Sequence, residues 1–141
     1  MKILFGTDGS DAALKALRAL ADRYGWFAGT PQLTLLHVHP PIPYGLAARW
    51  VGKQAIAEHC AEESAKALAS ARSLLDARQI AYDTAARIGE PAHEIVTFAR
   101  DGAFDCIALG SHGHTALATL MLGSVAQKVL ASATLPVLTL R

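Results

Sequence analysis

Two hydrophobic patterns alternate along this chain, and their alternation restricts its fold more than any other feature. Short apolar runs, rich in β-branched residues or leucine, predict strands, and longer stretches with apolar residues three and four positions apart predict helices. Strands that alternate with helices form βαβ units, whose strands are parallel. The expected strands are Lys2–Thr7, Gln32–His39, Ile80–Ile88, Cys106–Leu109 and Leu135–Leu140. The chain is therefore expected to be an α/β protein with a five-stranded parallel sheet.

Four helices are expected between and after these strands. Ser10 is placed to cap the first helix, because a serine hydroxyl can accept a hydrogen bond from a free N–H of the first turn. The second helix is long, Lys53–Arg78, or about 39 Å at the usual rise per residue. Pro91 begins the third, where its missing N–H costs nothing, and Gly123-Ser124 opens the fourth, which ends near Ser132.

Right-handed crossover connections place such helices on both faces of the sheet. The expected arrangement is a doubly wound sheet of strand order 3-2-1-4-5. In that order the first and fourth strands send their connections to opposite sides, and ligands bind in the crevice formed there. This crevice would bring Asp8, at the end of the first strand, beside Gly110, at the end of the fourth.

Composition limits the classes of function. The chain has 141 residues and 52% apolar content, so a single domain over residues 1–141 can build its own core. Its net charge of +1 gives no basic face for nucleic acid. Cys60 and Cys106 lie in apolar or helical surroundings and are expected to be buried thiols of a reducing compartment. Without a signal-peptide pattern or a long apolar run, the chain is expected to be cytoplasmic, with no membrane partner.

A glycine-rich segment is the most informative motif. It reads Gly110-Ser111-His112-Gly113, then nine residues, then Gly123-Ser124-Val125. Glycines allow a positive φ and a close approach of the backbone to a ligand, and free N–H groups at the start of the following helix form a seat for an anion. The alternative is an ordinary strand-to-helix loop with turn glycines. No P-loop motif is present, because Gly52-Lys53 is followed by Gln54.

The spacing Gly110-x2-Gly113-x9-Gly123-Ser124 resembles the ATP-binding signature of the universal stress protein family. The opening segment from Ile3 to Ser10 is similar to that family's first strand and turn. Three further segments match its remaining landmarks: His37-Val38-His39, Gly89-Glu90-Pro91-Ala92 and Leu135-Pro136-Val137-Leu138. The resemblance covers essentially the whole chain.

This resemblance implies a stress-response protein that binds ATP, ADP or AMP, with Mg²⁺ or Mn²⁺ held through the phosphates. Asp8, with Thr7 in the same turn, would face the ribose or adenine, and Val38 would offer backbone groups to the adenine edge. The residues implied around ribose and phosphates are Gly110, His112, Gly113, Gly123, Ser124 and Val125. The family's last strand commonly pairs with that of a partner, which implies a homodimeric regulator or sensor paired through Val137, Leu138, Thr139 and Leu140.

The loop departs from the family pattern at three positions. His114 and Thr119 stand where basic residues are common, and Ala116 stands where the family has a glycine. A charge-assisted hydrogen bond contributes about 1.5–3 kcal/mol, so the lost positive charge would weaken triphosphate binding and makes AMP, ADP or a differently charged ligand more plausible. The alternative is a dimeric interaction module of the same fold that has lost its nucleotide. An adenylylating enzyme is a third possibility, but no substrate-carboxylate or pyrophosphate motif supports it.

Other polar residues have less specific interpretations. Asp8 could instead bond its own backbone in a turn. His37 and His39 share one face of a strand, but with Cys60 they make a weak metal set, so no metal site is expected. No residues form a recognisable catalytic group, so ATP hydrolysis should be slow at most. Trp26 and Trp50 are expected to be packing or loop anchors. Whether Pro40–Gly52 closes over the pocket is left open.

Overall fold

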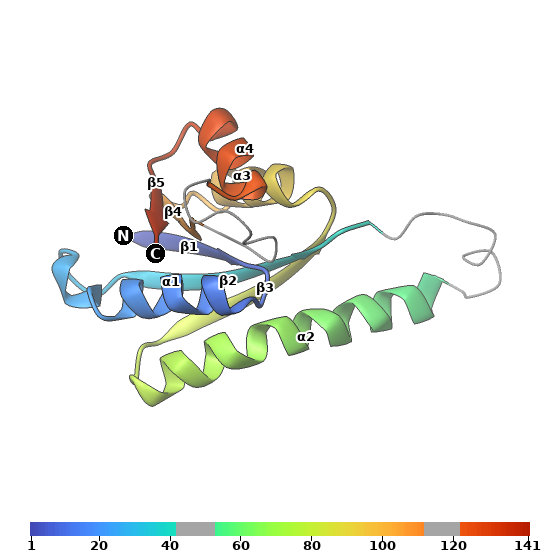
Figure 1. Cartoon of the computed structure of the whole chain (residues 1–141), viewed down its shortest axis with the longest axis horizontal. Helices are drawn as coiled ribbons and strands as arrows, with labels where there is room; N and C mark the ends of the chain where they lie inside the picture. The colour runs from blue at the N-terminus through green and yellow to red at the C-terminus, as the bar shows by residue number, and fades with distance from the viewer. Residues whose placement is uncertain (42–52, 112–121) are drawn as a thin grey trace.

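A computed structural model describes residues 1–41, 53–111 and 122–141. Its strands form one five-stranded parallel sheet (Figure 1). The strand order is β3-β2-β1-β4-β5. The strands are β1 (Lys2–Thr7), β2 (Gln32–His39), β3 (Tyr82–Ile88), β4 (Cys106–Gly110) and β5 (Val137–Leu140). The predicted fold class and strand order are confirmed.

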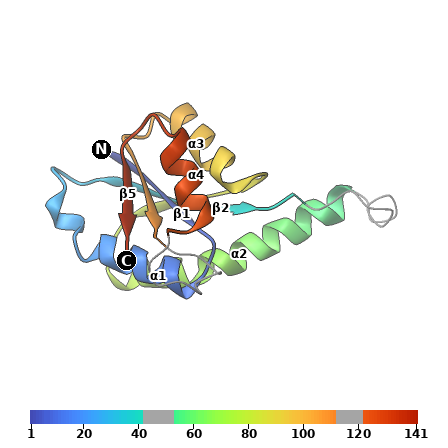
Figure 2. The same cartoon turned by 45° about the horizontal axis from the view of Figure 1, so that its top comes forward.

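Helices cover both faces of the sheet, as the crossover rule requires. Helices α1 (Asp11–Ala21) and α2 (Lys53–Ala77) lie on one face, and α3 (Pro91–Asp101) and α4 (Ser124–Ser132) lie on the other (Figures 1 and 2). The Ser10 hydroxyl accepts a hydrogen bond from the Ala13 N–H at 3.1 Å, which confirms the predicted cap of α1.

The core consists of two layers, one on each side of β1. Ile3 and Phe5 point into the layer under α1 and α2, and Leu4 points into the layer under α3 and α4. All three side chains are fully buried, as expected for a central parallel strand. Each large apolar side chain buried in this way contributes about 1.5–3 kcal/mol to folding.

Strand boundaries differ from the prediction where the backbone has a local reason to turn. β3 begins at Tyr82 rather than Ile80, because the Ile80 N–H still bonds the Leu75 carbonyl at 3.1 Å and Gln79 has a left-handed φ of 55°. β5 begins at Val137 rather than Leu135, since Pro136 has no N–H to donate.

Several residues outside the sheet differ from expectation. Trp26 was expected to be a packing or loop anchor, and the packing interpretation is wrong: Trp26 lies in a short 3₁₀ helix, Tyr24–Trp26, and is 80% exposed. Trp50 lies outside the described residues. Both cysteines are free thiols; Cys60 is buried, and partial burial raises the pKa of Cys106. In the described parts of the chain, no helix is both long and apolar enough to cross a membrane.

Candidate functional site

A cavity of about 590 Å³ lies at the carboxyl edge of the sheet, where the connections of β1 and β4 diverge. This volume is within the range of roughly 300–1,000 Å³ that is typical of small-molecule sites. The ends of β1, β2 and β4 line it, together with residues of α2 and α3 and the first turn of α4. The cavity therefore coincides with the predicted crevice.

Seven of the nine residues predicted to contact a ligand line this cavity. They are Thr7, Asp8, Val38, Gly110, Gly123, Ser124 and Val125. The other two, His112 and Gly113, lie outside the described residues, as do His114, Ala116 and Thr119. Most of the Pro40–Gly52 segment is also outside them, although Pro40 itself lines the cavity.

The turn after β1 places Asp8 at the cavity, and the Asp8 carboxylate also accepts a hydrogen bond within this turn. One carboxylate oxygen accepts a hydrogen bond from the Ser10 N–H at 3.0 Å, and the Thr7 hydroxyl accepts one from the Gly9 N–H at 3.2 Å. The local turn that the sequence left as an alternative role for Asp8 is therefore present. The same turn holds the Asp8 side chain beside the cavity, so the two roles are compatible.

The start of α4 presents backbone donors to the cavity. The Gly123 N–H donates to the Ser111 carbonyl at 2.8 Å, and the first intrahelical bond runs from Gln127 to Gly123. The amides of Ser124, Val125 and Ala126 therefore precede the helical ladder, and all three residues line the cavity. Gly123 has a φ of −59°, so the expectation of a positive φ is wrong at this glycine. Gly123 can still contribute through its small size, because the absence of a side chain lets a ligand approach the backbone closely.

The backbone of Val38 reaches the cavity because β2 extends past the end of β1. The last registered pair of these strands is Thr7 with His37, whereas β2 continues beside β3 to His39. The His39 carbonyl accepts a hydrogen bond from the Gly89 N–H, so it faces β3. Successive residues of a strand direct their backbone groups to opposite edges, so the Val38 carbonyl faces the other way, past the end of β1 and toward the cavity.

A buried histidine connects the cavity to α2. His37 lines the cavity, is only 8% exposed, and its Nδ1 lies 3.0 Å from the hydroxyl of Ser64, which is also buried. Burial lowers the pKa of His37, with a smaller contribution from His39. The Nδ1 of His39 is 2.6 Å from the Pro40 carbonyl. Within residues 1–41, 53–111 and 122–141, no three His, Cys, Asp or Glu side chains gather as metal ligands.

Because the pKa of His37 is depressed in the folded state, the unfolded chain binds more protons below about pH 6.5. Stability should therefore fall as pH drops from 7 to 5. The substitution His37→Gln removes the titrating group, and its amide can still bond Ser64, so this part of the decrease should disappear. Urea unfolding at several pH values measures the effect. His93→Gln, at an exposed position, is the control and should keep the decrease.

The sequence did not identify two charged residues of α2 at the cavity. Glu63 and Lys66 both line it and form an ion pair of 2.9 Å. The helical periodicity places Lys66 on the outer face of α2, and it is indeed exposed. Periodicity distinguishes the sheet-facing side of a helix from the other side, but it does not indicate which residues border a cavity beyond the end of a strand. The sequence signal that was available is the i,i+3 spacing of Glu63 and Lys66, which indicates an ion pair on the helix surface but not its position beside the cavity.

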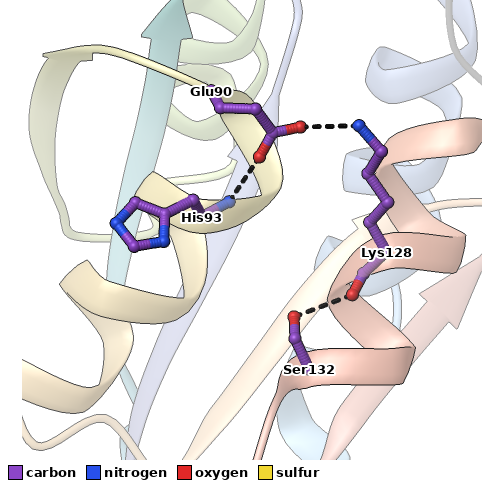
Figure 3. Close-up of polar contacts among 4 residues, drawn as sticks. All are labelled: Glu90, His93, Lys128 and Ser132. Atoms are coloured by element: carbon purple, nitrogen blue, oxygen red, sulfur yellow. Dashed lines mark hydrogen bonds and ion pairs between the residues drawn. The ribbon is translucent and has the colours of Figure 1, made fainter.

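Glu90 connects helices α3 and α4 (Figure 3). One carboxylate oxygen accepts the His93 N–H at 2.8 Å and caps α3, and the other accepts a bond from Lys128 of α4 at 2.9 Å. These interactions lower the pKa of Glu90, with the backbone bond the larger cause. Lys128 lies one turn after Ser124, so this ion pair helps to hold the first turn of α4 in place.

Comparison with known proteins gives one consistent result. The model of the universal stress protein family matches residues 1–141. Universal stress protein MJ0531 of Methanocaldococcus jannaschii is 32% identical over 141 residues, covering 99% of this chain and 81% of that protein. The structure of the universal stress protein UspA from Lactobacillus plantarum aligns with a TM-score of 0.81 and 25% identity, covering 100% of this chain and 97% of that one.

Some solved structures of this fold contain adenine nucleotides. The universal stress protein from Archaeoglobus fulgidus in complex with dAMP aligns with a TM-score of 0.66 and 24% identity, covering 100% of this chain and 98% of that one. Other universal stress protein structures, one in complex with cAMP and one from Arabidopsis thaliana with AMP bound, also align with a TM-score of 0.66. At these identities the likeness shows a shared fold.

Proposed function

The chain belongs to the universal stress protein family, and we propose that its cavity binds an adenine nucleotide. The observation that carries the proposal is the convergence of Val38, Asp8 and the first turn of α4 on one cavity of about 590 Å³. The dAMP, cAMP and AMP complexes of the same fold support an adenosine ligand. Each part of such a ligand has a chemically suitable neighbour in the cavity.

At the base end, the Val38 carbonyl is directed to accept a hydrogen bond from the exocyclic amino group of adenine. The apolar side chains of Leu36, Ile95 and Leu109 line the cavity and offer surface to the rings. The Asp8 carboxylate lines the cavity, is held by the hydrogen bond from the Ser10 N–H, and would accept hydrogen bonds from ribose hydroxyls. A base with a carbonyl in place of the amino group would oppose one acceptor with another at Val38, so guanine should bind more weakly.

At the phosphate end, the amides of Ser124, Val125 and Ala126 would donate to phosphate oxygens. The positive end of the α4 dipole would add about 0.3–1 kcal/mol in favour of an anion. Lys66 is the only lysine or arginine that lines the cavity among the described residues, and Glu63 already pairs with it. This limited positive charge favours AMP or ADP over ATP, unless Mg²⁺ or Mn²⁺ bound to the phosphates adds charge.

The proposed role is a homodimeric regulator whose bound nucleotide changes its behaviour, with at most slow ATP hydrolysis. The outer edge of β5 is the proposed dimer surface. The Pro136 carbonyl accepts the Ile107 N–H and the Leu140 carbonyl accepts the Ser111 N–H, so these alternate residues face β4. Val137 and Thr139 therefore direct their backbone groups outward, where a second β5 could pair.

The substitution Thr139→Pro should separate the proposed dimer into monomers. Proline removes an outward N–H without removing a β4–β5 bond, and proline is tolerated at sheet edges. We expect the dimer dissociation constant to rise at least about tenfold, the effect of losing roughly 1.4 kcal/mol. Analytical ultracentrifugation measures it, and Thr139→Ala, which keeps the N–H, is the matched control. An unchanged dimer would exclude this edge.

Native mass spectrometry of freshly purified protein tests the nucleotide proposal. Added mass equal to AMP, ADP or ATP, or saturable heat on titration with these nucleotides, would support it. Protein that carries no nucleotide and gives no heat with any of the three would contradict it. In that case the dimeric interaction module becomes the preferred function, because the loop positions His114, Ala116 and Thr119 have departed from the family pattern.

A further inference from the structure

The edge of the sheet formed by β3 has features of a second pairing surface. β3 is the outermost strand on its side of the described sheet, and its seven residues pair with β2 without interruption from Tyr82 to Ile88. This length is about 23 Å at the usual rise. Its exposed residues are Asp83, Thr84, Ala86, Arg87 and Ile88. Edge strands commonly use proline, a bulge or charged side chains, above all lysine, against pairing; β3 contains no proline, lysine or bulge, and its charged side chains are Asp83 and Arg87.

The backbone register shows which groups face outward. The His39 carbonyl accepts the Gly89 N–H, so His39 bonds the two residues that flank its registered partner, Ile88. Gly89 and Arg87 therefore face β2. Because backbone groups alternate between the two edges of a strand, Tyr82, Thr84, Ala86 and Ile88 direct their N–H and C=O groups away from the sheet.

The side chains of β3 are arranged symmetrically about Ala85. Tyr82 and Thr84 hydrogen-bond residues of α2, Asp76 and Arg72, so the alternate positions lie on the opposite, α3 face. There, Asp83 precedes Ala85 by two residues and Arg87 follows it by two, and the Arg87 guanidinium lies 4.8 Å from the ring centre of Phe98 in α3. Opposite charges at equal distances from a central small residue make the strand self-complementary in the antiparallel direction.

We propose that a second copy of this chain pairs antiparallel along β3, with Ala85 opposite Ala85. In this register Asp83 of each copy faces Arg87 of the other, and Tyr82 faces Ile88, which is 51% exposed. Opposite charges and aromatic–aliphatic pairs are both favourable directly across strands. Thr84 faces Ala86, and both direct backbone groups outward. In the single chain the Ala86 carbonyl accepts a hydrogen bond from the Arg87 guanidinium at 3.2 Å. Pairing exchanges this bond for one from Thr84 of the other copy, so backbone hydrogen bonds can form on each side of the two-fold axis.

This pairing does not depend on nucleotide binding, and it uses the edge opposite to β5. If both edges pair, the sheets join into chains of more than two copies, because each two-fold contact leaves the other edge available. The β3 contact is therefore tested in the Thr139→Pro variant, in which pairing along β5 is weakened. In that variant, dimerisation that depends on the residues at positions 83 and 87 reports pairing along β3.

Charge reversal tests the register in that variant. Asp83→Arg places two arginines opposite each other at both ends of the contact, and Arg87→Asp does the same with two aspartates. Sedimentation equilibrium up to about 1 mM covers the weak end of specific association. The parent should dimerise within this range, each single reversal should weaken the dimer at least about tenfold, and the double reversal should restore it to within about threefold. Circular dichroism spectra confirm that each variant is folded.

Mixing the two single-reversal variants gives the sharpest result. Arginines at both positions of one chain then face aspartates at both positions of the other, so an equimolar mixture should form a heterodimer more tightly than either variant dimerises alone. A parent that stays monomeric up to about 1 mM would overturn the proposal. Single reversals without effect, or a mixture that stays monomeric, would also overturn it.

Discussion

Replacing Gly123 by valine is expected to reduce the affinity for AMP at least about 100-fold, a loss of roughly 2.7 kcal/mol. Gly123 lines the cavity immediately before the amides of Ser124, Val125 and Ala126. A branched side chain at this position would keep a phosphate group from approaching those donors, and each charge-assisted hydrogen bond lost costs about 1.5–3 kcal/mol. Isothermal titration calorimetry measures the change.

The fold should tolerate this substitution, because the φ of Gly123, −59°, is accessible to valine. Valine is a poorer helix N-cap than glycine, so a cost of about 1 kcal/mol in stability is expected. Gly25→Val is the matched control: a Cβ at Gly25 would meet no atom within 4 Å, and Gly25 does not line the cavity. Equal AMP affinity in both variants would exclude the first turn of α4 from the binding site.

Replacing Gly9 by alanine is expected to destabilise the folded protein strongly, and more than the same replacement at Gly29. Gly9 has a φ of 76°, and a Cβ there would lie 2.9 Å from the Ala67 Cα of α2. Left-handed backbone costs a non-glycine residue about 1–2 kcal/mol, and overpacking adds about 1–3 kcal/mol. The expected total is about 2–5 kcal/mol, or a fall in melting temperature of roughly 5–20 °C.

Gly29→Ala separates the two contributions. Gly29 has nearly the same φ, 73°, but a Cβ there would meet no atom within 4 Å. This control should lose only the backbone part, about 1–2 kcal/mol. Denaturant unfolding of both variants gives the difference, which reports the contact between the turn after β1 and α2. Equal losses would show that α2 does not pack against this turn as closely as described.

The sheet was predictable because each of its determinants is local or general. The apolar runs mark the strands, and right-handed crossovers leave few possible strand orders. Seven predicted ligand contacts then line one cavity, since the carboxyl ends of adjacent parallel strands lie together. Asp8 and Gly110 illustrate this: they are about a hundred residues apart in the chain, but they follow neighbouring strands.

The contributions of α2 were not predictable in the same way. Lys66 borders the cavity because of the position of α2 along its own axis relative to the end of β2. That position depends on the packing of α2 against the turn at Gly9. The bond between His37 and Ser64 likewise depends on the position of α2 along β2. Hydrophobic periodicity determines which side of a helix faces the sheet, but not its position along its own axis.

The central claim is that an adenine nucleotide occupies the cavity at the carboxyl edge of the sheet. Amide chemical shifts from two-dimensional ¹H–¹⁵N NMR, recorded while AMP is added, test it most directly. We predict saturable shifts at Asp8, His39, Gly110 and the first turn of α4, with little change at the distant 3₁₀ helix Tyr24–Trp26. Saturation without shifts at Asp8 and Ser124, or the absence of any shift at millimolar AMP, would contradict the claim.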